Sequence, residues 1–137
     1  IASQMGRQLA ENGVQVASGL ARGVDASAQK GSLSIAGNRT FAVMGCGVDI
    51  CYPRQNIETY MLIQENGGII SEYPPGMPPV AGNFPMRNRI ISGISDCILV
   101  IEAGEKSGSL ITAAYGAEQG KDILVVPGDI GNKLYYG

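Results

Sequence analysis

The residues of this sequence best suited to binding a ligand lie in short glycine-containing segments that follow apolar runs. The segment Lys106-Ser107-Gly108-Ser109 offers backbone N–H groups, two hydroxyls and one positive charge, a combination that suits a phosphate. Ser107 would also serve as the N-cap of a following helix, and the two roles are compatible. A P-loop is excluded, because neither GxxxxGKS nor GxxxxGKT occurs.

A second segment places an aromatic residue and two arginines beside a predicted helix start. Arg87 and Arg89 are two positions apart, roughly 200° around a helix, so they cannot share one face. One could reach a phosphate while the other pairs with a carboxylate or a carbonyl. Phe84 is either a hydrophobic staple or an exposed platform on which a base stacks.

Charged residues also end other apolar runs. Arg22 either faces a ligand or forms an ion pair with Asp25 that shapes the turn. Glu72 and Glu102 each end a predicted strand, where a carboxylate could hold an arginine or a ribose hydroxyl, and we favour this orienting role over acid–base work.

Composition excludes much of enzyme chemistry. The chain has no histidine, which removes Ser-His-Asp and Cys-His pairs, histidine-ligated metals and the usual general base. No carboxylate spacing or acidic cluster indicates acid–base catalysis or a metal, so we expect no catalytic residue, no metal and no cofactor. The net charge of −2 gives no general attraction for polyanions, so nucleic acid would need a local site.

The three cysteines, Cys46, Cys51 and Cys97, form no CxxC pair. We interpret them as packing thiols of a reduced, cytoplasmic protein. No apolar run approaches the roughly 20 residues of a membrane span.

Short apolar runs alternate with segments of helical period. The predicted strands are Val14-Ser18, Thr40-Gly45, Gly68-Glu72, Cys97-Ile101 and Asp122-Pro127. The predicted helices between them are Asp25-Ala36, Asn56-Asn66, Pro85-Ser95 and Ser107-Gln119, the last with an apolar stripe of Leu110, Ala113, Ala114 and Ala117. This order predicts an α/β fold, a doubly wound, mostly parallel sheet with helices on both faces. Ligands of such sheets bind at the carboxyl ends of the strands, where the segments above lie.

We expect one domain, residues 1–137, that is truncated at both ends. The first 13 residues read as a helix ended by a glycine, with no strand before it. A Rossmann-like unit normally opens with a strand, so we expect one to precede this sequence. Residues 131–137 read as an interrupted loop.

The loop segments together resemble the DprA/Smf DNA-processing proteins. The matching stretches are SGLARGVDASAQKGSL (18–33), FAVMGCGVDICYPRQN (41–56), GGIISEYPPGMPP (67–79), GNFPMRNRIISGIS (82–95) and VIEAGEKSGSLITAAYGAEQGKDILVVPG (100–128). The resemblance covers nearly the whole chain. It implies a Rossmann-like domain that binds single-stranded DNA without marked sequence preference, forms a homodimer and helps load the recombinase RecA in natural transformation. It also implies that the chain is not an enzyme.

The resemblance carries roles onto matching positions. Phe84 would contact a base, and Arg87, Asn88 and Arg89 would build the pocket wall. The phosphate pocket would be lined by Lys106, Ser107, Gly108 and Ser109, with Arg22 nearby.

The chain also departs from the family pattern. An expected arginine-bearing first turn is absent, Ala81 stands where some members have lysine, and part of the dimer contact is expected beyond Pro127. These departures imply a weakened, salt-sensitive DNA site.

Two other functions remain open. The related phosphoribohydrolases carry a catalytic glutamate in GGxGTxxE, but Thr112 stands at that position here, which argues against hydrolysis. A module that binds a small nucleotide in the same glycine-rich pocket is the other alternative.

Overall fold

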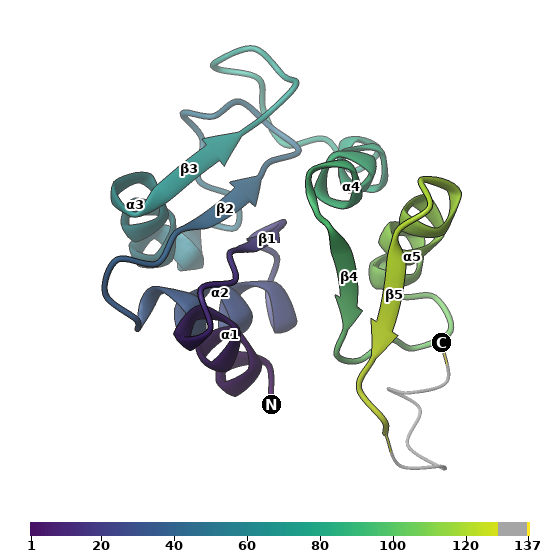
Figure 1. The fold of residues 1–137 in the computed structure, drawn as a ribbon. Coiled ribbons are helices and arrows are strands. Elements are labelled where there is room, and N and C mark those ends of the chain that lie inside the picture. Colours follow the sequence, from purple (N-terminus) through teal and green to yellow (C-terminus); the bar gives the residue numbers. More distant parts are fainter. Residues whose placement is uncertain (129–136) are drawn as a thin grey trace. The chain divides into compact units, whose positions relative to one another are not determined.

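The computed structural model describes residues 1–128 and 137, and in this part of the chain parallel strands alternate with helices (Figure 1). The predicted α/β fold with parallel strands is confirmed, since every strand pairing among the described residues is parallel. Most of the predicted terminal loop, residues 131–136, lies outside the described residues. The chain divides into two compact units, Ile1–Arg87 and Asn88–Gly137. The single domain of residues 1–137 stays a prediction.

The first unit contains a parallel sheet with the strand order β1-β2-β3. Its strands are β1 (Val16–Ser18), β2 (Thr40–Val43) and β3 (Gly67–Ile70), and its helices are α1 (Ala2–Glu11), α2 (Val24–Leu33), the 3-10 turn η1 (Arg54–Asn56) and α3 (Ile57–Glu65). The register pairs Val16 with Thr40 and Thr40 with Gly67. All three strands therefore end at the same edge of the sheet, where their following loops begin.

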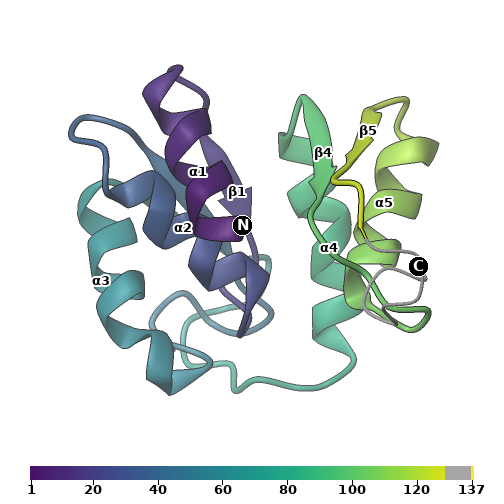
Figure 2. The same cartoon turned by 90° about the horizontal axis from the view of Figure 1, so that it is seen from below.

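The helices of this unit pack in a row, α1 against α2 and α2 against α3, and Figure 2 shows α1 beside α2. Glycine is required where α1 and α2 cross. A Cβ on Gly6 would lie 2.0 Å from the carbonyl oxygen of Ala28, and one on Gly31 would lie 2.0 Å from that of Ser3. Any side chain at either position would separate the helices, so these glycines hold α2 and the loop that precedes it in place.

A buried apolar cluster fills the first unit. It consists of Leu20, Ala42, Met44, Cys46, Tyr60 and Ile63. Three of its members, Met44, Cys46 and Leu20, come from loops that directly follow strands. The core therefore reaches the edge of the sheet where the strands end, and the loops there are anchored by burial as well as by hydrogen bonds.

The second unit contains β4 (Cys97–Val100), α5 (Gly108–Glu118) and β5 (Asp122–Val125), and the helix α4 (Asn83–Ile94) begins in the first unit and ends in this one. Its buried cluster is Ile98, Val100 and Ala103, with Leu110, Ala113 and Ile123 packed against it.

The predicted apolar stripe of α5 is only half correct. Leu110 and Ala113 pack on the cluster, but Ala114 and Ala117 are exposed. Gly116 is buried in their place, and a Cβ there would lie 2.8 Å from Cγ1 of Ile98. The helix presents its smallest residue to the sheet, because only glycine allows so close an approach.

Candidate functional site

The loop between β1 and α2 has a strained backbone. Leu20 has a φ of 56°, in the left-handed region that a leucine rarely adopts. Its side chain is fully buried in the core, and Nδ2 of Asn56 donates a hydrogen bond of 2.9 Å to its carbonyl oxygen. A left-handed non-glycine residue costs about 1–2 kcal/mol, so burial and the Asn56 contact offset this cost and hold the loop in one conformation.

Asp25, in the first turn of α2, fixes the same loop from its other end. One carboxylate oxygen accepts hydrogen bonds from the backbone N–H groups of Gly19 (3.1 Å) and Ala21 (3.3 Å). Of the two alternatives for Arg22, the ion pair with Asp25 is not formed: the carboxylate binds backbone donors, and Arg22 is exposed. Arg22 is left at the surface of the loop, where a ligand can reach it.

Arg87 is buried under this loop. Only 5% of the residue is exposed, and Nη1 donates to the carbonyl oxygens of Gly19 (3.0 Å) and Val43. Burial lowers the pKa of the guanidinium, while the negative charge of Asp25 opposes that shift. Gly19 must lack a side chain, because a Cβ there would lie 2.7 Å from the guanidinium carbon.

Arg87 therefore has the carbonyl-binding role that the sequence left open to the two arginines of α4. It joins the end of β1 to the end of β2, which makes it part of the wall beneath the loops. A guanidinium with two backbone carbonyls as acceptors is held in one orientation.

Phe84 lies against a second aromatic ring, Tyr52, to which no sequence motif gave a role. Its ring stacks on Tyr52 with a centroid distance of 5.4 Å and an interplanar angle of 30°. A Cβ on Gly45 would lie 2.8 Å from its Cδ1 atom, and Cζ of Arg87 lies 5.6 Å from its centroid. Phe84 is half-buried, while Tyr52 is 45% exposed. Nothing local in the sequence pairs the two rings, because Tyr52 lies in the loop after β2 and Phe84 in the first turn of α4.

Hydrogen bonds join the loop after β2 to the loop after β3. Asp49 accepts from the backbone N–H of Gly76 (2.8 Å), and the Ser71 hydroxyl donates to the carbonyl oxygen of Cys46 (2.7 Å). Nδ2 of Asn83, the first residue of α4, donates to the carbonyl oxygen of Gly45 (3.1 Å). These contacts fix the loop after β2, which carries Tyr52, relative to the loop after β3 and the start of α4, which carries Phe84.

In the second unit, the start of α5 has the geometry that the sequence predicts. Ser107 is the N-cap, and its hydroxyl accepts a hydrogen bond of 3.3 Å from the backbone N–H of Ser109. Lys106 and Gly108 are exposed beside it. Nδ2 of Asn88, on α4, donates to the carbonyl oxygen of Gly108 (3.3 Å). An exposed helix N-terminus with a lysine beside it attracts an anion.

Arg89 is half-buried and follows Asn88 on α4. Its carbonyl oxygen accepts hydrogen bonds from Nε2 of Gln119 (3.2 Å) and from the Ser92 hydroxyl (3.1 Å). The predicted residues thus form two groups. Arg22, Phe84 and Arg87 lie in the first unit, and Asn88, Arg89 and Lys106 to Ser109 lie in the second.

The three cysteines carry free thiols. Cys46 is buried, Cys51 is half-buried, and burial raises the pKa of both thiols. For Cys97 the predicted packing role is wrong, because its side chain is exposed. Among residues 1–128 and 137, no group of His, Cys, Asp and Glu side chains could hold a metal ion. Within the same residues, no helix is long and apolar enough to cross a membrane.

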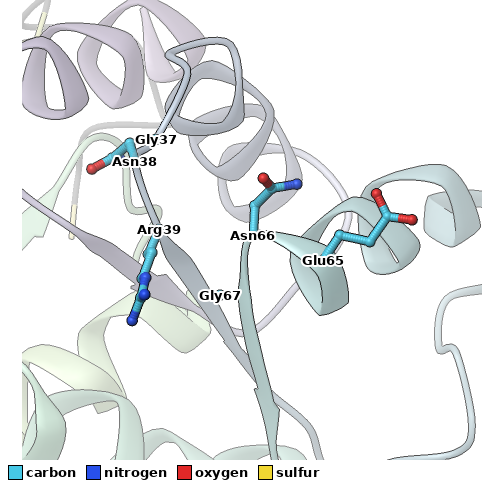
Figure 3. Close-up of a pocket in the computed structure, with 6 residues that line it drawn as sticks. All are labelled: Gly37, Asn38, Arg39, Glu65, Asn66 and Gly67. Carbon is cyan, nitrogen blue, oxygen red and sulfur yellow. The ribbon is translucent and has the colours of Figure 1, made fainter.

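A shallow hollow of about 420 Å³ lies at the other end of the first sheet, where β2 and β3 begin. It is lined by Gly37, Asn38, Arg39, Glu65, Asn66 and Gly67. Figure 3 shows that the side chains of Arg39 and Glu65 point away from each other. Because its polar groups do not converge, this hollow does not compete with the loops at the carboxyl ends of the strands.

A family model described as DNA recombination-mediator protein A matches residues 1–137. The chain belongs to this family. The resemblance to DprA/Smf proteins that the loop motifs indicated is thereby confirmed.

Curated relatives in the family match most of this chain. Protein Smf of Escherichia coli (strain K12) is 46% identical over 125 residues, which are 90% of this chain and 33% of that protein. DNA processing protein DprA of Bacillus subtilis (strain 168) is 38% identical over 130 residues, 95% of this chain and 43% of that protein. The chain thus spans less than half the length of these curated relatives.

Solved structures of the family share the fold. DNA processing protein A from Streptococcus pneumoniae superposes with a TM-score of 0.85 at 38% identity, over 97% of this chain and 47% of that one. The protein from Helicobacter pylori, whose structure concerns its single-stranded DNA binding mode, gives 0.88 at 33% identity over 96% of this chain and 60% of that one.

Proposed function

We propose that this chain binds single-stranded DNA without catalysing a reaction. The observation that carries the proposal is the fold shared with the Helicobacter pylori protein, at a TM-score of 0.88 and 33% identity, whose single-stranded DNA binding mode has been described. The loops at the carboxyl ends of the strands are the expected place for such a ligand. They carry an aromatic pair, an exposed arginine and a capped helix N-terminus with a lysine.

In the first unit, the aromatic pair that includes Phe84 offers a base a stacking surface, which tolerates any sequence because every base has a π face. Arg22 is exposed on the neighbouring loop and supplies a charge for a phosphate. Arg87 is a wall residue in this proposal, because its guanidinium binds two backbone carbonyls beneath the loops.

In the second unit, the residues at the start of α5 bind phosphate in this proposal. The exposed backbone around Gly108, the Ser107 and Ser109 hydroxyls and the Lys106 ammonium are the donors. Asn88 positions this turn through the carbonyl oxygen of Gly108. We assign Arg89 a further phosphate contact.

The wider role follows from family membership. We propose that the longer protein acts as a homodimer in the cytoplasm, protects incoming single strands in natural transformation and helps load the recombinase RecA. Two sites on a dimer would raise the avidity for a long strand through effective concentration. Membership of the DNA recombination-mediator family supports this role.

Binding without chemistry is favoured over hydrolysis. The chain has no histidine, and Thr112, at the position of the phosphoribohydrolase glutamate, would need a base to activate it. A module that binds a small nucleotide differs from a strand-binding protein in one measurable property: a free mononucleotide competes with the strand efficiently only in the first case.

The test is fluorescence anisotropy of a labelled oligo-dT at low and then moderate salt, with duplex DNA and free mononucleotide as competitors. We expect strand binding that salt weakens and that neither competitor displaces efficiently. Competition by mononucleotide at the strength of the strand would replace the proposal with the small-nucleotide module.

Two variants test the site assignment. We expect Phe84→Ala and Arg89→Glu each to weaken strand binding and to leave the domain folded. Arg39→Glu is the matched control for charge, because it makes the same change at the other end of the first sheet. Equal affinity in Arg89→Glu and Arg39→Glu would remove Arg89 from the site.

A further inference from the structure

The two rings of the aromatic pair differ in how much surface they offer a ligand. Phe84 is half-buried at the start of α4, whereas 45% of Tyr52 is exposed. They stack at a centroid distance of 5.4 Å, so a base that stacks on this pair meets one ring first. The exposed fractions indicate that this ring is Tyr52.

The surroundings of Phe84 support this order. Tyr52 stacks against one side of the ring, Gly45 lies within contact distance of its edge, and Cζ of Arg87 lies 5.6 Å from its centroid. The position of Gly45 is fixed, because Asn83 donates a hydrogen bond to its carbonyl oxygen. The Arg87 guanidinium is fixed as well, because it donates to two backbone carbonyls. Phe84 is therefore a supported ring with few free contacts.

Tyr52 is exposed but its backbone is anchored. It lies between Cys51, which packs against the buried cluster, and Pro53, which is buried. Asn56, soon after it, is buried and bonds the carbonyl oxygen of Leu20. A ring on a fixed backbone loses little conformational entropy when it receives a ligand. Arg54 is exposed two residues further on.

We infer that Tyr52 is the residue on which a base of single-stranded DNA stacks, and that Phe84 supports the Tyr52 ring from behind. This inference rests on the proposed function and refines it, because it moves the direct base contact from Phe84 to a residue that no motif assigned. The rings act as a two-layer platform, with Arg87 as its positioning residue.

The first experiment measures oligo-dT affinity in variants of the exposed ring. Tyr52→Ala removes the stacking surface and is expected to weaken binding at least about fivefold, the loss typical of one base–aromatic stack. Tyr52→Phe keeps the ring and is expected to bind like the wild type. Leu62→Ala is the matched control, because Leu62 is 46% exposed on α3 and is also truncated to alanine.

The second experiment observes the stack directly. The chain has no tryptophan, so Tyr52→Trp introduces a single reporter whose fluorescence is quenched when a base stacks on it. We expect quenching by oligo-dT and none by an abasic oligonucleotide of the same length, which carries the same phosphates. Leu62→Trp, on α3, is expected to give no quenching with either oligonucleotide.

The outcomes separate the inference from the proposed function. If Phe84→Ala loses affinity while Tyr52→Ala binds like the wild type, Phe84 is the base contact and the inference is overturned, but the proposed function stands. If Tyr52→Phe loses as much oligo-dT affinity as Tyr52→Ala and the Tyr52→Trp reporter is not quenched, the Tyr52 hydroxyl stabilises the loop and no base stacks on the ring. The inference is then also overturned. A wild-type chain that does not prefer single strands overturns both.

Discussion

The β1–α2 loop of the first unit and the start of α5 in the second are both glycine-containing turns that lead into a helix, but they are stabilised differently. The first loop is held by Asp25, Asn56 and Arg87, of which Asn56 and Arg87 lie 36 and 68 positions from the residues they bond. The start of α5 is held by Ser107, whose hydroxyl accepts from a residue two positions away, and by Asn88, which lies 20 positions from the Gly108 carbonyl oxygen that it bonds.

This difference teaches where binding can be changed without unfolding the protein. The first loop contains a strained leucine and a buried guanidinium, so its conformation depends on the packed core of its unit. A change in its support should lower stability and binding together. The start of α5 is local and partly exposed, so its contribution to binding can be separated from its contribution to stability.

The largest expected effect is in Arg87→Ala. The variant leaves the carbonyl oxygens of Gly19 and Val43 without their guanidinium donor, and it opens a buried space. We expect the free energy of unfolding to fall by about 3 kcal/mol, since hydrogen bonds to charged groups are strong and buried acceptors are costly to leave unpaired. Urea denaturation measures it. Arg22→Ala, at an exposed site, is the control, and equal stability of the two variants would contradict a buried support for the loop.

Asp25→Ala should have the next largest effect. It removes the acceptor of the Gly19 and Ala21 N–H groups in the strained loop, and we expect a loss of about 1–2 kcal/mol in the free energy of unfolding. Asp25→Asn retains one acceptor oxygen and should recover part of the loss. Thermal unfolding of both variants provides the measurement, and an unchanged midpoint in Asp25→Ala would show that the loop needs no carboxylate.

Ser107 provides the contrasting case. Ser107→Ala removes the N-cap of α5 and should cost about 1 kcal/mol. Ser107→Asp keeps a capping oxygen, so its stability should match the wild type, but its negative charge faces the proposed phosphate and should weaken oligo-dT binding severalfold. Anisotropy and urea denaturation on the same samples separate the two quantities. Parallel losses of stability and binding in Ser107→Asp would remove the contrast between the two turns.

The smallest expected effect is a loss of stability at alkaline pH, caused by two thiols of the first unit. Burial raises the pKa of the Cys46 and Cys51 thiols above the ordinary value of 9.0. The folded chain keeps these protons at a pH where the unfolded chain has released them, so the free energy of unfolding should decrease as the pH rises above about 9. Urea midpoints from pH 7 to 10 test this, and a Cys46→Ala/Cys51→Ala double variant should show a shallower decrease. An equal slope would assign the pH dependence to other groups.

Features that depend on neighbouring residues were predicted well from the sequence. Ser107 was identified as an N-cap, and the structure confirms it. The five strands and the helices between them lie within the expected ranges, apart from end residues. The helical period of α5 was predicted correctly, but half of its buried face was not. The pattern is based on apolar side chains, so it gives no signal for Gly116, which has no side chain and is buried against Ile98.

Contacts between distant segments were not predictable. Asp25 and Arg22 are close in sequence and opposite in charge, which left an ion pair open, yet the carboxylate accepts hydrogen bonds from backbone N–H donors of the strained loop. Arg87 carried no sign of burial, because a buried arginine is recognised only by the carbonyls that surround it. The role of Tyr52 was not predictable for the same reason, since its ring partner lies 32 positions away, in the first turn of α4.

The sequence by itself therefore determined the order of strands and helices, the capped start of α5 and the family, because hydrophobic period, capping and motif residues act over a few positions. Only the tertiary structure decided that Arg87 supports the loops, that Leu20 is strained and buried, and that Tyr52 covers Phe84. The physical reason is that these roles depend on which carbonyl, core or ring the folded chain brings within contact distance, and no local pattern records that distance.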